Sequence, residues 1–154
     1  WKEQVEQLYQ FALSRKIPLR FIELMPFGGA SSLEGVDVAR VASYLEQAHG
    51  KRDTQEEVFG DGPATYWYYG GVAVGFIGAL SHQFCSQCNR IRLLSDGNLK
   101  LCLDQAATID LSTLIHPDDE ALIASIRSAL QEKQEHHHFA DGEGIRPSLA
   151  LIGG

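Results

Sequence analysis

The chain has 154 residues, of which 44% are hydrophobic and 21% charged, and its net charge is −7. This length suffices for one domain, or for a domain with part of a neighbour. Nucleic-acid-binding proteins usually carry a basic stripe, so the acidic balance argues against DNA or RNA as a partner. No apolar run reaches the roughly eighteen residues of a membrane span, so no membrane partner is expected. All three cysteines lie in one short stretch, which favours metal ligation in a reducing, cytoplasmic compartment over disulfides.

The first 34 residues predict a helix, a strand and a loop. Apolar residues recur at helical spacing over 1–16, and PLRFIELM (18–25) is a short apolar run that PFGG ends. The chain opens within the helical pattern and without a methionine, so we expect it to be a piece of a longer protein. In such α/β units, ligands bind at the carboxyl end of the strand. Glu23 stands there, either for chemistry or in a buried ion pair with Arg20.

The next segments predict a second helix and then short strands. The segment 31–50 has helical spacing, with Asp37 or Ser32 as its cap and Gly50 after its end. The segment 56–80 is aromatic, β-branched and rich in glycine, which predicts antiparallel strands joined by turns. Its aromatic residues at 66–69 could stack a base, but alternating aromatic residues on a strand more often divide between core and surface.

A third helix is predicted after Pro117. Its first turn would hold three acids, Asp118, Asp119 and Glu120, which we interpret as helix-terminal acids by position and not as a catalytic pair. The tract 136–138, three histidines, is predicted to be a solvated helix end near the negative end of the helix dipole. The apolar face of this helix is predicted to hold Leu122, Ile123, Ile126 and Leu130.

The stretch FCSQCNRIRLLSDGNLKLCL (84–103) has the cysteine spacing C-x2-C-x13-C. Two thiolates with two residues between them can reach one metal from a tight turn, while the third must return from elsewhere. The segment SDGN is a hairpin signal between two extended runs. A hairpin at this point would bring Cys102 back beside Cys85 and Cys88.

The loop of this hairpin decides which side chains share a face. A two-residue turn would place Cys102 on the face opposite Arg90 and Arg92. A three-residue loop over 95–97, ending in a left-handed glycine, pairs Cys102 with Arg90 and Lys100 with Arg92, all on one face. We predict this second register, because it places a metal centre and three positive side chains on one surface.

The cysteines leave the kind of metal open. Zinc bound by three cysteines and one histidine, either His82 or one of 136–138, would make a structural or binding module without redox chemistry. A 4Fe–4S cluster with three thiolates instead leaves one iron open to a nitrogen or oxygen of a substrate. Arg90 and Arg92 would then offer fork-shaped donors to a phosphate, although a solvated strand face with ion pairs is the commoner role of such residues.

The run C-x2-C-N-R-x-R…D-G-x-L…C-L, with RFIELMPFGG (20–29) upstream and a terminal IGG, resembles the C-terminal part of the molybdenum-cofactor biosynthesis protein A family, the GTP 3′,8-cyclases. The resemblance covers nearly the whole chain. It implies a radical S-adenosylmethionine enzyme and an α/β fold of α+β character. Residues 1–34 would be the last elements of an incomplete TIM-type barrel. Residues 35–154 would form a C-terminal domain of short antiparallel strands with flanking helices.

The resemblance also implies a reaction and its site. The family converts GTP to (8S)-3′,8-cyclo-7,8-dihydroguanosine 5′-triphosphate, on the way to the product of the downstream cyclic pyranopterin monophosphate synthase. The guanine base would bind the open iron of a 4Fe–4S cluster. The residues implied are Cys85, Cys88 and Cys102 for the cluster, Arg90, Ile91 and Arg92 for GTP, Met25 for S-adenosylmethionine, and Gly153 and Gly154 for a tail that reaches the active site.

The family's C-x3-C-x2-C motif, which anchors the radical-generating cluster, is absent, and no further cysteine is available to build it. S-adenosylmethionine and this second cluster would therefore belong to the full-length parent. We expect the chain to be inactive alone and to bind GTP weakly, and we expect the parent to be cytoplasmic, with a homodimer as one arrangement.

Overall fold

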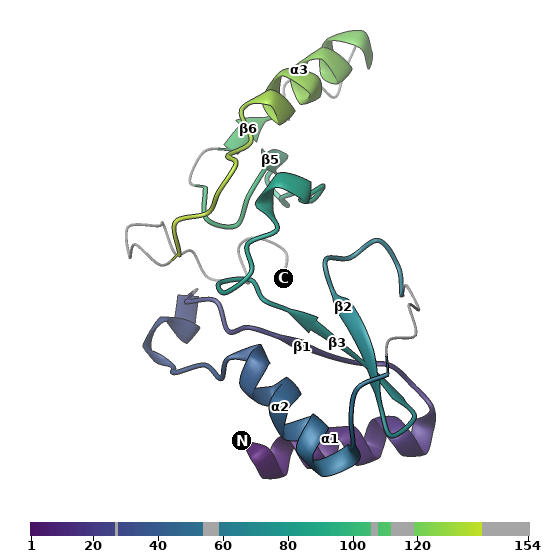
Figure 1. Ribbon diagram of the computed structural model, residues 1–154. Coiled ribbons are helices and arrows are strands. Elements are labelled where there is room, and N and C mark those ends of the chain that lie inside the picture. The colour runs from purple at the N-terminus through teal and green to yellow at the C-terminus, as the bar shows by residue number, and fades with distance from the viewer. Residues whose placement is uncertain (27, 54–58, 106–107, 112–118, 140–154) are drawn as a thin grey trace. The chain divides into compact units, whose positions relative to one another are not determined.

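The computed structural model describes residues 1–26, 28–53, 59–105, 108–111 and 119–139 (Figure 1). These residues divide into two compact units, each with a core of its own. Unit 1 comprises residues 1–24 and the described residues of 34–82, and unit 2 comprises those of 25–33 and from 83 onward. None of the described helices has the length and apolar character that crossing a membrane requires.

Unit 1 contains two helices, α1 (Lys2–Arg15) and α2 (Val38–His49). Helix α2 begins where its cap predicts, because the Asp37 carboxylate accepts a hydrogen bond from the Ala39 N–H at 2.7 Å. It ends at Gly50, which has φ of 93° and so adopts a conformation that favours glycine. Both predicted helices of this unit are thereby confirmed, and Asp37 is the cap.

Three strands of unit 1 form one sheet in the order β1-β3-β2: β1 (Leu19–Ile22), β2 (Thr65–Tyr69) and β3 (Val72–Ile77). Strand β1 runs parallel to β3, and β2 pairs with β3 as an antiparallel hairpin. Every residue of β3 is buried, as suits a central strand. The strand predicted within residues 1–34 thus pairs with a strand predicted within 35–154, and the domain boundary between those ranges stays a prediction.

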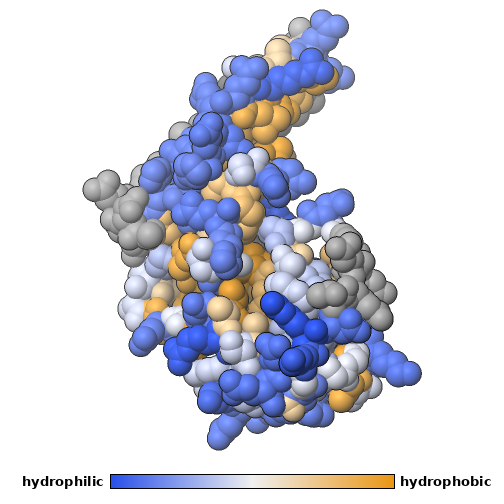
Figure 2. Space-filling view, in the orientation of Figure 1, coloured by the Kyte–Doolittle hydropathy of each residue, from blue (hydrophilic) through white to orange (hydrophobic). Residues whose placement is uncertain are grey.

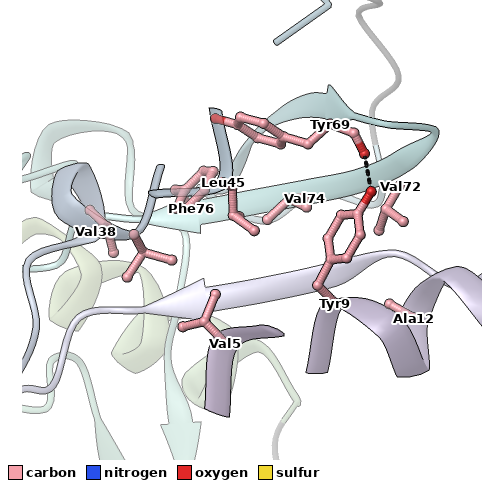
Figure 3. Packing of buried hydrophobic residues seen from close by; sticks show 10 residues of the cluster. Val5, Tyr9, Ala12, Val38, Leu45, Tyr69, Val72, Val74 and Phe76 are labelled. Carbon is pink, nitrogen blue, oxygen red and sulfur yellow. Dashed lines mark hydrogen bonds between the residues drawn. The ribbon is translucent and has the colours of Figure 1, made fainter. Parts of the chain in front are cut away.

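The core of unit 1 lies between the two helices and one face of this sheet (Figure 3). Alternate residues of β3 contribute to it, because side chains of a strand alternate between faces. The Tyr9 hydroxyl of α1 donates to the Tyr69 carbonyl at 2.8 Å and so joins helix to sheet within the core. The buried residues of this core are Val5, Tyr9, Ala12, Val38, Val41, Leu45, Tyr69, Val72, Val74 and Phe76.

Unit 2 contains a second sheet in the order β4-β5-β6, antiparallel throughout: β4 (Arg92–Leu93), β5 (Asn98–Lys100) and β6 (Thr108–Asp110). Two 3₁₀ turns, η1 (Gly28–Ser32) and η2 (Cys85–Gln87), precede it, and helix α3 (Asp119–Gln131) follows it. Leu99, Leu101 and Leu111 pack with Ala129 of α3. The helices and the two small sheets of the described residues make a mixed α/β fold, as predicted.

Helix α3 buries a narrower face than predicted. Leu122 and Ile126 pack against the core of unit 2, whereas Ile123 and Leu130 are 47% and 44% exposed. Figure 2 shows apolar side chains of α3 at the molecular surface. The packed positions Leu122, Ile126 and Ala129 follow one ridge of the helix, and Ile123 and Leu130 lie one position further around it. The predicted start of this helix, Pro117 and Asp118, lies outside the described residues.

Candidate functional site

Cys85 and Cys88 lie at the two ends of one tight turn, because η2 begins at Cys85 and Cys88 is its C-terminal cap. The Cys88 N–H donates to the Cys85 carbonyl at 3.1 Å, and the Gln87 N–H donates to the Phe84 carbonyl at 3.0 Å. The C-x2-C spacing thus spans one tight turn, as predicted. Both thiols are half-buried and free, as is the thiol of Cys102.

The hairpin after this turn has the predicted three-residue loop. Arg92 pairs with Lys100 across the ladder, and the Leu94 N–H donates to the Asn98 carbonyl at 2.8 Å. Gly97 has φ of 84°, the left-handed conformation that such a loop requires. The register prediction is thereby confirmed within the ladder. The ladder begins at Arg92, so the predicted pairing of Cys102 with Arg90 would fall just beyond it.

The predicted surface of three positive side chains is wrong for Lys100, which is buried. Lys100 is 3% exposed, and its ammonium donates to the main-chain carbonyl of Gln105. This burial lowers the pKa of Lys100. The strand alternation that places Lys100 beside Arg92 is correct, but the chain after β5 returns over Lys100 and removes it from solvent. Arg90 is exposed and Arg92 is half-buried.

The cysteines suit a soft metal or an iron–sulfur cluster by their chemistry, since all three are free thiols in the same unit. In geometry the fit is incomplete. Across the described parts of the chain, no three His, Cys, Asp or Glu side chains are grouped closely enough to hold a metal ion. The three-cysteine ligand set therefore stays a prediction.

The histidines considered as a fourth metal ligand are His82 and those of the tract 136–138, and the structure gives a main-chain hydrogen bond for His82 and for His138. His82 is exposed, and its N–H donates to the Gly78 carbonyl at 3.0 Å. The tract 136–138 was expected at the end of a helix, but α3 ends at Gln131, five residues earlier. Within the tract, the His138 N–H donates to the buried Asp104 carboxylate. The backbone of the tract is thus held by a tertiary contact and not by a helix terminus.

Lys133, two residues after α3, contacts the cysteine turn directly. Its ammonium donates to the Cys88 carbonyl at 2.7 Å and to the Arg90 carbonyl at 2.8 Å, and it lies 3.5 Å from the Cys88 sulfur. The sequence contains no signal for this contact, because a single lysine after a helix does not indicate which distant carbonyls it reaches.

Glu23 lies at the carboxyl end of β1 and is 6% exposed. Its carboxylate accepts hydrogen bonds from the Leu80 N–H at 2.6 Å, from the Ser81 N–H at 2.9 Å and from the Ser81 hydroxyl. Burial disfavours the charged form, but these hydrogen bonds outweigh it and hold the pKa of Glu23 below its ordinary value. The alternative ion pair with Arg20 is wrong, because Arg20 Nε donates to the Tyr66 hydroxyl at 2.7 Å instead.

The other residues implied by the family resemblance are Met25, Ile91, Gly153 and Gly154. Met25 is half-buried and packs against Phe139 in a small apolar cluster with Leu94 and Leu103. Ile91 is 41% exposed. The predicted tail, 153–154, lies outside the described residues.

Comparison with known proteins gives the chain's relationships. Residues 17–139 match the family model described as Molybdenum Cofactor Synthesis C. A GTP 3′,8-cyclase of Ectopseudomonas mendocina is 36% identical over 153 residues, which covers 94% of this chain and 46% of that protein. Proteins of the same name from Desulforamulus reducens and Pelotomaculum thermopropionicum are 36% and 32% identical, over 92% and 99% of this chain.

The chain thus spans about half the length of the curated relatives it matches. The matched range 17–139 includes the turn with Cys85 and Cys88, the β4–β5 hairpin and Lys133. It also makes up more than half of the chain. The chain belongs to the Molybdenum Cofactor Synthesis C family.

Proposed function

We propose that the chain is the cluster-bearing, GTP-binding C-terminal part of a GTP 3′,8-cyclase in molybdenum-cofactor biosynthesis. The names of its relatives support this activity, and their coverage of nearly the whole chain supports the placement at one half of the enzyme. The observation that carries the proposal is the arrangement of 85–102. It combines two free thiols at the ends of one turn, a third two residues after the returning strand β5, and an arginine in the hairpin between them.

In this proposal Cys85, Cys88 and Cys102 are the ligands of a 4Fe–4S cluster, which would supply an open iron for the guanine base. Arg90 and Arg92 bind the triphosphate, because a guanidinium can donate two parallel hydrogen bonds to a phosphate. Arg92 is the better placed of the two for orientation. Its backbone is fixed by the ladder with Lys100 and its side chain is half-buried, so less freedom is lost when it binds an anion.

The same proposal assigns the remaining chemistry to the longer parent. The radical-generating cluster and S-adenosylmethionine would be held there, with residues 1–34 as the end of an incomplete barrel and Met25 at the S-adenosylmethionine site. Gly153 and Gly154 would reach into the active site. The parent would be cytoplasmic, a homodimer is one arrangement we propose for it, and its product would pass to cyclic pyranopterin monophosphate synthase. The isolated chain would then bind GTP without converting it.

Metal analysis of the chain tests this function. After anaerobic reconstitution we expect about four irons and four sulfides per chain, as a single 4Fe–4S cluster requires, and little zinc. Added GTP should change the electron-spin-resonance signal of the reduced cluster. Replacing both arginines (Arg90→Ala with Arg92→Ala) should abolish that change and leave the iron content unaltered.

Two outcomes would contradict the proposal. One zinc per chain with no iron, even after anaerobic reconstitution, would identify a zinc-bound structural or binding module instead. A cluster whose signal responds to GTP equally in the wild type and the double arginine variant would show that Arg90 and Arg92 do not bind the substrate. Arg15→Ala is the matched control, because Arg15 is an exposed arginine of α1 in unit 1.

A further inference from the structure

Lys133 uses all its hydrogen-bonding capacity on one short segment. An ammonium has three N–H donors, and three acceptors surround this one: the Cys88 carbonyl at 2.7 Å, the Arg90 carbonyl at 2.8 Å and the Cys88 sulfur at 3.5 Å. Two of these acceptors are main-chain carbonyls that the β4–β5 ladder does not engage, since β4 begins at Arg92. Lys133 therefore provides for this segment what a strand partner would otherwise provide.

The segment held by Lys133 joins the two parts of the candidate site. Residue 88 ends the cysteine turn, and residue 92 begins the ordered hairpin strand. Between them the residues 89–91 are exposed and lie outside any helix or strand. Without Lys133 this linker would keep few contacts, and the spacing between the cysteine turn and the arginines would be free to vary. A charged donor is suited to the task, because its hydrogen bonds are stronger than those of a neutral group.

We propose that Lys133 is a positioning residue for the site. Its ammonium fixes the main chain from Cys88 to Arg90 and directs an N–H at the Cys88 sulfur. Only the second part of this inference, the effect of the hydrogen bond to the Cys88 sulfur, rests on the proposed function. If Cys88 ligates an iron–sulfur cluster, the third hydrogen bond acts on a ligand sulfur, and such contacts set the reduction potential of a cluster. The first half, fixation of the main chain, concerns the protein alone.

The first test is hydrogen–deuterium exchange on the complete, metal-free chain with its thiols reduced. In Lys133→Met, which keeps an unbranched side chain but removes the charge and donors, we expect amide exchange in 85–91 to accelerate about tenfold. Exchange in β5, the central strand of the second sheet, should not change, which would show that unit 2 of the variant is folded. Lys51→Met is the matched control, because Lys51 is an exposed lysine of unit 1. Equal exchange of 85–91 in the wild type and Lys133→Met would overturn the proposal.

The second test is the reduction potential of the reconstituted cluster. Removing a positive donor next to a ligand sulfur disfavours the more negative, reduced cluster, so Lys133→Met should have a lower potential than the wild type. Lys133→Arg, which keeps the charge and the N–H donors, should restore most of the difference. A residue with a purely structural role would not give this pattern. Equal potentials in the wild type and Lys133→Met would refute the contact with the sulfur.

The two tests separate the inference from the proposed function. If the wild-type chain takes up no iron, the proposed function fails, while the exchange experiment still decides whether Lys133 fixes the segment. If the wild type assembles a GTP-responsive cluster and Lys133→Met matches it in exchange and potential, the proposed function stands and the role of Lys133 is rejected.

Discussion

The buried side chain of Glu23 connects the C-terminal ends of two parallel strands, β1 and β3. Strand β1 ends one residue before it, and the Leu80 and Ser81 N–H groups that it accepts from follow the end of β3. These N–H groups belong to residues beyond the end of the strand, so the sheet ladder does not pair them. A buried carboxylate is tolerated here because several donors stabilise its charge. Glu23, for which the sequence left chemistry or an ion pair with Arg20 open, thus has a clear structural role.

Replacing this carboxylate tests that role. Glu23→Gln removes the charge from the oxygen that accepts from both N–H groups and replaces with an NH₂ group the oxygen that accepts from the Ser81 hydroxyl. The charge-assisted hydrogen bonds are thereby weakened, so we expect a loss of about 1–3 kcal/mol in the free energy of unfolding at pH 7. Urea titration followed by tryptophan fluorescence measures it, since Trp1 and Trp67 both belong to unit 1. Glu34→Gln, a change at an exposed glutamate, should be nearly neutral.

The pH dependence of this difference gives a sharper test. The folded-state pKa of Glu23 is lowered, so its contribution is fully present above the unfolded pKa, about 4.3, and is lost as pH falls through the folded pKa. The gap between wild type and Glu23→Gln should therefore narrow below about pH 4. A gap that stays constant from pH 7 to pH 3 would contradict a stabilising ionised carboxylate.

At the scale of elements, the sheet of unit 1 depends on a glycine in its central strand, β3. Gly75 pairs with Tyr66 across the ladder, and a Cβ at position 75 would lie 2.5 Å from the Tyr66 ring. This close approach lets the ring lie flat over the strand, where its hydroxyl accepts from Arg20 Nε at 2.7 Å. Glycine has a low β-propensity, but here the absence of a side chain leaves room for the Tyr66 ring of the neighbouring strand.

Adding a methyl group at this position should force the ring away. We expect Gly75→Ala to lower the free energy of unfolding by about 1–3 kcal/mol, the usual cost of overpacking. Gly29→Ala is the control, because a Cβ there meets no atom within 4 Å. In a Tyr66→Ala background the cost of Gly75→Ala should largely disappear. An equal cost in both backgrounds would show that the contact with the ring is not the cause.

The elements that could be predicted from the sequence are those set by local chemistry. Asp37 and Gly50 specify the ends of α2 through a side-chain cap and a positive φ, and Gly97 specifies the hairpin loop in the same way. These signals act within a few residues and need no knowledge of the rest of the chain. The register of β4 and β5 follows from the loop, so the face that carries Arg92 was predicted correctly.

The parts that could not be predicted depend on contacts between distant segments. Lys100 is buried because the chain folds back at Gln105, and alternation along a strand does not reveal such a return. Lys133 meets Cys88 and Arg90 only because α3 packs on the second sheet and ends near the cysteine turn. The hairpin of the candidate site was therefore predictable from the sequence, but the contacts that hold it were not, and its metal ligands stay a prediction.

For the whole molecule, the division into two units separates the optical reporters from the candidate metal ligands. Both tryptophans lie in unit 1, while Cys85, Cys88 and Cys102 all lie in unit 2. Each unit has its own buried core. A ligand that binds only the folded form stabilises the part of the chain that contains its site. Binding of a cluster should therefore stabilise unit 2 selectively.

Thermal unfolding of the metal-free and reconstituted chains tests this expectation. Because a metal centre binds only when its ligands are brought together, its binding free energy becomes folding free energy. Each 1 kcal/mol gained should raise the midpoint temperature for the unfolding of unit 2 by about 4–8 °C. The hydrogen-exchange protection of residues 83–105, measured as a function of temperature, reports this midpoint. The tryptophan transition of unit 1 should stay in place. In Cys102→Ser the gain in unit 2 should be lost. A tryptophan transition that rises equally with the cluster would instead show that the two units unfold together.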